Sequence, residues 1–216
     1  MFHDRFRIGP LLVVGAVLMI GGCGDGEDWP ALDEPGVTGG WSTAGCELVR
    51  LPEHVTVAGV TMPATPAKLD AVMARIDQAG RGDFADSYAG QQVDQGRVRA
   101  IVYRVPSAAF DDFIRRAAED TCIVVRDAAH SAVDLAYWHD RVLADLAYWT
   151  EQGIRIATIG ARHDGTGVEV GSRDVARAKR ELPARYGSRA PLVFVEEGPI
   201  VPLASPPRRP AGPPGS

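Results

Sequence analysis

The first 23 residues limit what this chain can fold into more than any other feature does, because they determine the compartment in which the rest of the chain folds. Two arginines precede an apolar run over residues 11–20, and two glycines follow that run. The run of about ten residues is half of the roughly 20 that a membrane-spanning helix needs. A basic start, a short apolar run and small residues after it are typical of a secretory signal peptide. The sequence therefore predicts export, with residues 1–22 as the signal peptide.

The end of this segment resembles the lipobox of bacterial lipoproteins. Its string Ile20-Gly21-Gly22-Cys23 places small residues directly before a cysteine, with Ile where most lipoboxes have Leu. The resemblance implies cleavage before Cys23, fatty chains such as palmitate on the mature N-terminus, and a lipid anchor at the extracytoplasmic face of the cell membrane. Several acyl chains, at about 0.8 kcal/mol per buried methylene, give stable anchoring. A plain signal peptide with a chance cysteine and an uncleaved anchor are the alternatives.

Both flanks of the predicted domain have the composition of unstructured segments. Residues 24–45 contain five acidic residues, scattered Gly and Pro, and no Lys or Arg. We expect residues 23–45 to form a lipidated start and a flexible acidic tether. Residues 199–216 are rich in proline, so we expect a disordered and extended tail.

Two cysteines remain if Cys23 is acylated. Cys46 and Cys122 can pair, because exported proteins fold where disulfides form. Two buried free thiols, each packed as a small apolar group, are the alternative. Neither cysteine belongs to a CxxC pair, which leaves redox catalysis and zinc binding without support.

Composition and motifs indicate a globular protein without recognisable catalytic machinery. The chain is 45% hydrophobic and 24% charged, as in a globular domain, and its net charge of −5 argues against a nucleic-acid partner. The strings GxSxG, GxxxxGKS/T, GxGxxG and HExxH do not occur. His130 and His139 flank a helix start, where capping or solvent exposure is their ordinary role. We therefore expect no catalytic residue, no cofactor and no metal.

Apolar periodicity and turn signals predict an α+β domain. Helices are expected after the N-cap residues Thr65, Ser107, Ser131 and Ser172, the third of them running to about residue 152. Strands are expected at 88–93, 97–103, 121–125, 154–159, 168–170 and 192–195, with short extended segments at 46–59. The order β-β-α-β-α-β-β-α-β describes helices packed on one face of a mostly antiparallel sheet. Residues 46–87 are assigned to an N-terminal extension with one helix, and residues 88–198 to the α+β domain.

The longest predicted helix has two apolar faces. One face is an apolar stripe that we expect to face the sheet, and it consists of Leu135, Trp138, Val142, Leu146 and Trp149. Tyr137 and Tyr148 lie on nearly the opposite side, and an amphipathic helix needs a cover for a second apolar face. Residues 46–79 could supply that cover. Otherwise the two tyrosines form an exposed surface for a partner, since Tyr is enriched in such surfaces.

The segment from Tyr88 to Gly198 resembles the C-terminal part of the pro-regions of secreted bacterial serine proteases of the alpha-lytic type. The matching strings are Tyr88-Ala89-Gly90 entering a strand, a Gly turn, a helix with aromatic anchors, Gly153-Ile154, Asp164-Gly165 and Val168-Glu169-Val170. The resemblance implies an α+β unit that assists protease folding and inhibits the product by adding its sheet to a protease hairpin. The sequence contains no Gly-Asp-Ser-Gly-Gly segment, so we expect a free-standing relative.

These features favour a non-catalytic, membrane-anchored lipoprotein that binds an extracytoplasmic protein or peptide. Strand addition at an exposed sheet edge is the binding mode that suits the fold, and residues 192–195 are the candidate strand. A structural envelope module without a specific ligand is one alternative. A small-ligand carrier or an enzyme with an unrecognised site is another.

Overall fold

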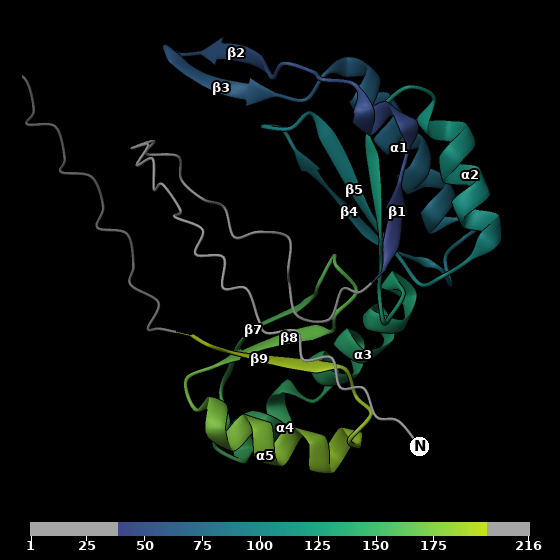
Figure 1. The fold of residues 1–216 in the computed structure, drawn as a ribbon. Coiled ribbons are helices and arrows are strands. Elements are labelled where there is room, and N and C mark those ends of the chain that lie inside the picture. The colour runs from purple at the N-terminus through teal and green to yellow at the C-terminus, as the bar shows by residue number, and fades with distance from the viewer. Residues whose placement is uncertain (1–38, 198–216) are drawn as a thin grey trace, which may run out of the picture. The chain divides into compact units, whose positions relative to one another are not determined.

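The computed structural model describes residues 39–197 and confirms an α+β fold (Figure 1). The predictions for the signal peptide, for Cys23, for residues 24–38 and for the tail at 199–216 lie outside the described residues. Within residues 39–197, no helix is both long enough and apolar enough to cross a bilayer.

The strand pairing is mostly antiparallel, as predicted, but the strands form three sheets, so the prediction of one single sheet is wrong. The strand orders are β1-β6-β5-β4, β2-β3 (Glu53–Val57 and Val60–Ala64) and β7-β8-β9. The physical reason is β1 (Gly40–Ser42), which pairs antiparallel with β6 (Ile123–Asp127). Strand β1 occupies the outer edge of β6, so the hairpin β7–β8 cannot pair there and extend the same sheet. Residues 40–42 were expected in the flexible tether, but they form this strand.

The first half of the described chain, residues 39–127, packs two helices on the four-stranded sheet. β4 (Tyr88–Asp94) and β5 (Arg99–Arg104) form the predicted hairpin, and α2 (Ala108–Ala118) leads from β5 to the parallel strand β6. Helix α1 (Ala67–Arg81) packs beside α2. The shared core consists mainly of Leu69, Val72, Ile76, Tyr88, Val102, Phe110, Ile114, Ile123 and Val125. Since it joins residues before and after position 88, the packing does not divide there.

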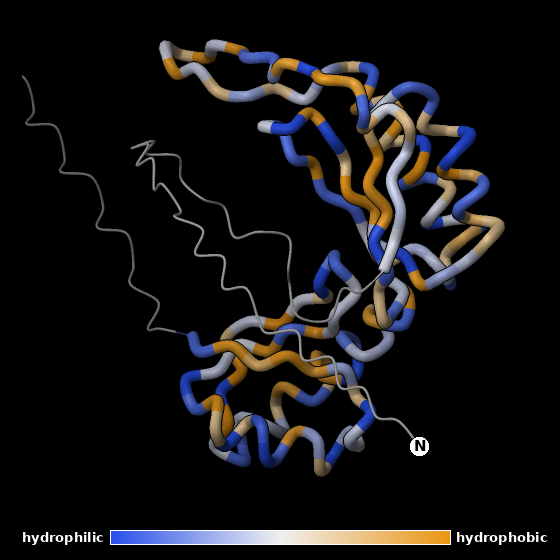
Figure 2. Tube along the Cα trace, viewed as in Figure 1, coloured by the Kyte–Doolittle hydropathy of each residue, from blue (hydrophilic) through white to orange (hydrophobic). Residues whose placement is uncertain are grey.

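The second half, residues 132–197, has its own core. Its sheet contains β7 (Ile156–Ala161), β8 (Val168–Ser172) and β9 (Leu192–Glu196). Its helices are α3 (Ala132–Ala144), α4 (Leu146–Glu151) and α5 (Val175–Tyr186). Figure 2 shows β9 as a hydrophobic stretch, whereas α5 carries many hydrophilic residues. The core contains Leu135, Val142, Trp149, Ile154, Val168, Val170, Ala178 and Leu182.

The two halves share one topology. In the first, a hairpin (β4–β5) is followed by α2 and by β6, which runs parallel to β5. In the second, a hairpin (β7–β8) is followed by α5 and by β9, which runs parallel to β8. The outer edges differ, because β1 lies along β6, whereas no strand of residues 39–197 lies along the corresponding edge of β9.

Two of the four predicted N-caps are confirmed. The side chains of Ser107 and Ser131 each accept a hydrogen bond from the backbone N–H three residues later, at 3.4 and 3.2 Å. The predictions for Thr65 and Ser172 are wrong. Ser172 still belongs to β8, and Asp174 caps α5 in its place. These serines and the aspartate satisfy backbone donors that a helix start leaves open.

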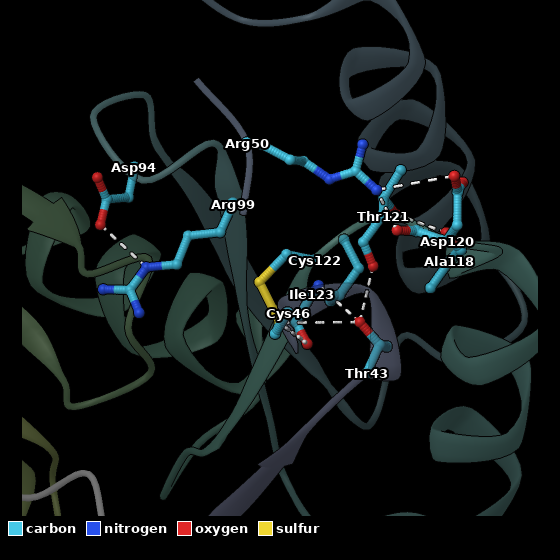
Figure 3. The surroundings of a disulfide bond; sticks show 10 residues. All are labelled: Thr43, Cys46, Arg50, Asp94, Arg99, Ala118, Asp120, Thr121, Cys122 and Ile123. Carbon is cyan, nitrogen blue, oxygen red and sulfur yellow. Dashed lines mark hydrogen bonds and ion pairs between the residues drawn. A yellow bond between two sulfur atoms is a disulfide. The ribbon is translucent and has the colours of Figure 1, made fainter. Parts of the chain in front are cut away.

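Cys46 and Cys122 form a disulfide, so the alternative of two free thiols does not apply (Figure 3). The bond joins a 3₁₀ helix, η1 (Ala44–Glu47), to the start of β6, with 4.2 Å between the two Cα atoms. The hydroxyl of Thr43 donates to the Thr121 carbonyl at 2.7 Å and supports the same junction. A glycine is required at position 45, because a Cβ there would lie 2.2 Å from a backbone carbonyl oxygen.

Candidate partner-binding surface

The helix predicted over residues 131–152 divides at Asp145 into α3 and α4. Asp145 has φ −96° and ψ 7°, and its carboxylate accepts two hydrogen bonds from the Arg185 guanidinium at 2.7 and 2.9 Å. The string Asp-Leu-Ala-Tyr-Trp occurs twice in this segment, at residues 134–138 and 145–149, and each copy lies at a helix start. Its first aspartate, Asp134, completes a capping box with Ser131, and its second begins α4.

The inner stripe of this helix pair is confirmed for four of its five predicted residues, and the fifth, Leu146, is half-buried and is not part of the second core. Leu135, Val142 and Trp149 are buried in the second core, and Trp138 is partly buried against it. The indole N–H of Trp149 donates to the hydroxyl of Tyr186 at 2.8 Å. That hydroxyl in turn donates to Asp145 at 3.0 Å. The buried polar atoms along this seam are thus satisfied.

Two pKa shifts define the charge state of that seam. The Arg185 guanidinium holds the pKa of Asp145 below its usual range through hydrogen bonds. Burial raises the pKa of Tyr186. At neutral pH, Asp145 is therefore ionised and Tyr186 is a neutral donor, which is the pairing that the geometry requires.

The outer face of the helix pair is exposed. Tyr137 is 57% exposed and Tyr148 is 38% exposed. The expectation that residues 46–79 cover them is wrong, because α1 from that segment packs into the first core. The other alternative, an exposed surface, holds for these two residues. Whether a partner binds there stays a prediction.

Each exposed tyrosine carries an arginine over its ring. The Cζ atom of Arg185 lies 4.0 Å from the centroid of the Tyr148 ring. The Cζ atom of Arg141 lies 5.7 Å from the Tyr137 ring and 5.0 Å from the Trp138 ring. We call Tyr137, Arg141, Tyr148 and Arg185 the Tyr–Arg patch. Contacts of this type contribute about 0.5–1 kcal/mol at exposed sites and order the side chains before any partner arrives.

The two arginines of the patch differ in their pairing. Arg185 is paired with Asp145, whereas Arg141 forms no ion pair with a carboxylate of residues 39–197. The sequence indicated both tyrosines but neither arginine as part of a surface. Arg141 follows Tyr137 by one helical turn, a spacing that could have indicated it. Arg185 comes from another helix, so no local pattern could have placed it here.

Strand β9 offers a second candidate, an open sheet edge. The predicted strand at 192–195 is present, and within the described residues β9 pairs only with β8. Leu192 and Phe194 pack on the second core, and the alternation of a strand points Val193 and Val195 to the opposite face. The backbone N–H of Glu197 donates to the carbonyl of β8 residue Ser172 at 3.2 Å. Since alternate residues face opposite edges, the N–H of Glu196 faces the open edge.

A cavity of about 460 Å³ lies between the ends of α1, β4 and β7. On its wall, Asp77 accepts hydrogen bonds from the Tyr88 hydroxyl at 2.7 Å and from Arg81 at 2.8 Å. Arg81 lowers the pKa of Asp77, and burial raises the pKa of Tyr88. His163, also on the wall, is hydrogen-bonded to Gln92 at 3.0 Å. These polar groups are hydrogen-bonded within the protein, so the cavity is a weaker candidate binding site than the Tyr–Arg patch and the edge of β9.

No group of three or more His, Cys, Asp or Glu side chains within residues 39–197 is arranged to hold a metal ion. The predicted lipidation site, Cys23, lies outside those residues. Comparison with models of protein families, with curated protein sequences and with solved structures finds no match to this chain.

Proposed function

We propose that this chain is a lipid-anchored, extracytoplasmic module that binds a protein or peptide partner and performs no chemistry of its own. The observation that carries the binding part is the difference between the two halves. In the first half, the edge of the last strand is filled by β1, whereas in the second half no strand of residues 39–197 lies along the equivalent edge of β9. The pairing of β1 with β6 therefore indicates what the edge of β9 could bind, which is a short antiparallel strand.

The composition of the second half supports the same proposal. Aromatic residues and Arg are enriched where proteins bind one another, and the Tyr–Arg patch presents both in a fixed arrangement. Arg141 donates to the Tyr137 hydroxyl at 3.4 Å and forms no ion pair with a carboxylate of residues 39–197, so its guanidinium can pair with a carboxylate of a partner. We assign β9 to the main-chain contact and the Tyr–Arg patch to a second, side-chain contact.

Two features support the proposed location. The lipobox-like string at residues 20–23 is the signal for the anchor. The disulfide between Cys46 and Cys122 suits an oxidising compartment, since such bonds are rare in the cytosol.

The binding proposal is tested with a photoreactive amino acid at Val195, in intact cells. We expect a covalent adduct with a partner after illumination. Glu196→Pro should reduce the adduct at least about tenfold, because the substitution removes an N–H from the open edge and leaves the ladder to β8 intact. The double substitution Tyr137→Ser and Tyr148→Ser should also weaken it.

Glu196→Ala is the matched control, since it removes the same side chain but keeps the backbone N–H. It should give the wild-type yield, and circular dichroism should show the same melting curve for both Glu196 variants. An adduct that survives Glu196→Pro would reject strand addition. No adduct at all would favour a structural envelope module without a specific ligand.

The anchor gives a separate prediction. Mass spectrometry of the mature protein should find an N-terminus at Cys23 that carries fatty chains, and the protein should sediment with membranes. Cys23→Ser should move nearly all of it to the soluble fraction. Intact protein that begins at Met1, carries no lipid and stays in the cytosol would contradict both the anchor and the location.

A further inference from the structure

The segment around α5 carries a concentration of positive charge that the proposed function does not use. Residues 173–189 contain six Lys and Arg residues but two Asp and Glu residues, which gives this segment a net charge of +4. Because the whole chain has a net charge of −5, the remaining residues together carry −9. An excess of positive charge therefore occurs in one short segment of an acidic protein.

Two adjacent cations of α5 are exposed and lack an acidic partner. Lys179 and Arg180 are exposed, whereas Ala178 and Leu182 face the second core and are buried. Neither cation forms an ion pair with a carboxylate of the described residues. Arg180 donates to the Ala176 carbonyl of its own helix at 3.1 Å, and a carbonyl leaves its charge uncompensated.

Further cations lie on the same helix and at its two ends. Arg177 is half-buried on α5 and donates to Glu181 at 2.7 Å. We call Arg177, Lys179 and Arg180, which lie on the outward half of α5, the basic face. Arg173 before the helix and Arg189 after it are exposed. Since a helix rises about 1.5 Å per residue, the three cations of the basic face lie within about 5 Å along the helix axis and act together on a facing surface.

The outward half of α5 has no large apolar side chain. Besides the cations it carries the small residues Ala176 and Ala184, and none of the exposed large apolar side chains belongs to residues 173–189. The energy of a protein interface comes mainly from a few buried aromatic, aliphatic or Arg anchors that fill pockets. A layer of phospholipid headgroups needs no pocket, because its negative potential attracts Lys and Arg side chains. The composition of the basic face therefore favours a lipid surface over a protein.

We propose that the basic face binds the anionic headgroups of the phospholipid bilayer that carries the anchor. The inference rests on the proposed lipid anchor, which keeps a bilayer within reach, since residues 24–38 span at most about 50 Å. An anionic bilayer attracts the +4 segment and repels the rest of the chain, so it turns α5 toward the surface. Because salt screens this contact, it orients the anchored protein and does not replace the anchor. Helix α5 packs on β8 and β9, so a bilayer on its outward side leaves the edge of β9 accessible (Figure 1).

Co-sedimentation with vesicles tests the proposal, using residues 23–216 with Cys23→Ser. This chain carries no lipid, and it folds as the whole protein does because it contains both cores and the disulfide. It should bind vesicles rich in phosphatidylglycerol, which is anionic, and not vesicles of phosphatidylcholine, which has no net charge. Raising the ionic strength from about 0.01 M to about 0.15 M should release it, because the Debye length falls from about 30 Å to about 8 Å.

Two variants of equal net charge locate the contact. Arg180→Glu reverses a cation of the basic face and should weaken binding to the anionic vesicles at least about tenfold. Arg116→Glu, on α2, is the matched control, because Arg116 is also an exposed helix residue without an acidic partner among the described residues. It should weaken binding at most about threefold. Both variants should keep the wild-type melting curve, since both side chains are exposed.

Three results would overturn the proposal. Equal weakening by Arg180→Glu and Arg116→Glu would mean that binding follows overall charge and not the basic face. Equal binding to both kinds of vesicle would mean that headgroup charge plays no part. A wild type that binds no vesicle rejects the membrane, and if it binds soluble polyglutamate instead, the face recognises an acidic protein. Since the tested chain carries no lipid, none of these outcomes depends on whether Cys23 is acylated in cells.

Discussion

Replacing both Cys46 and Cys122 by alanine is expected to lower the free energy of unfolding by about 4.5 kcal/mol, as the chain-entropy model gives for a loop of this length. The two cysteines are 76 residues apart, so the bond removes many conformations from the unfolded chain. It also holds η1 and β1 on the first sheet, because β1 pairs with β6 through three residue pairs only. Urea unfolding monitored by circular dichroism measures the loss.

Wild-type protein unfolded in the presence of a reductant is the control for this loss. It should reach the same midpoint as the double alanine variant, because both lack the cross-link but only one lacks the sulfur atoms. A loss below about 1 kcal/mol in the alanine variant would mean that the loop is already ordered in the unfolded state, and the entropic account would be wrong.

The second large effect is expected at Arg104. Its side chain is buried, with 4% of the residue exposed, between carboxylates from α2 and β6. It donates to Asp111 at 2.7 and 3.2 Å and to Asp127 at 2.5 Å. Arg104→Met should destabilise the fold by about 3–5 kcal/mol, because it leaves two carboxylates close together without their cation. Thermal and urea unfolding measure this.

A triple variant separates the lost cation from the lost packing. Arg104→Met combined with Asp111→Asn and Asp127→Asn keeps similar shapes and removes all three charges. It should recover most of the stability, since replacing a whole buried ion cluster is often close to neutral. If the single variant loses less than about 1 kcal/mol, water must reach the site and screen the carboxylates.

The sequence predicted well those helices, hairpins and caps that are formed by contacts between residues close together in the chain. The β4–β5 hairpin follows from alternation around a Gly turn, and the serine caps at Ser107 and Ser131 follow from local hydrogen bonds. The buried stripe of α3 and α4 follows from helical periodicity. The disulfide was one of two alternatives, and only the distance between the cysteines decides between them.

The remaining features depend on contacts that no local pattern records. Strand β1 is a Gly-Trp-Ser string without periodicity, and only its pairing with β6 makes it a strand. That pairing separates the sheets, so the number of sheets could not be read from the chain. Strand β3 contains Pro63, which disfavours a central strand but is tolerated where no further strand pairs. The Tyr–Arg patch needs Arg185, which only the tertiary fold brings to Tyr148.

The reinforcement of the fold is distributed unevenly. The disulfide, the Arg104 cluster and the strand that closes an edge all belong to the first half. Residues 132–197 contain an ion cluster of their own, in which Arg162 pairs with the buried Asp164 and with Glu169, but no disulfide and no strand along the outer edge of β9. We infer that this half is the first region to open when the protein is heated or exchanged into deuterated water. A partner strand bound along β9 would then stabilise the second half. Binding could be measured as slower amide exchange in β8 and β9, even before the partner is identified.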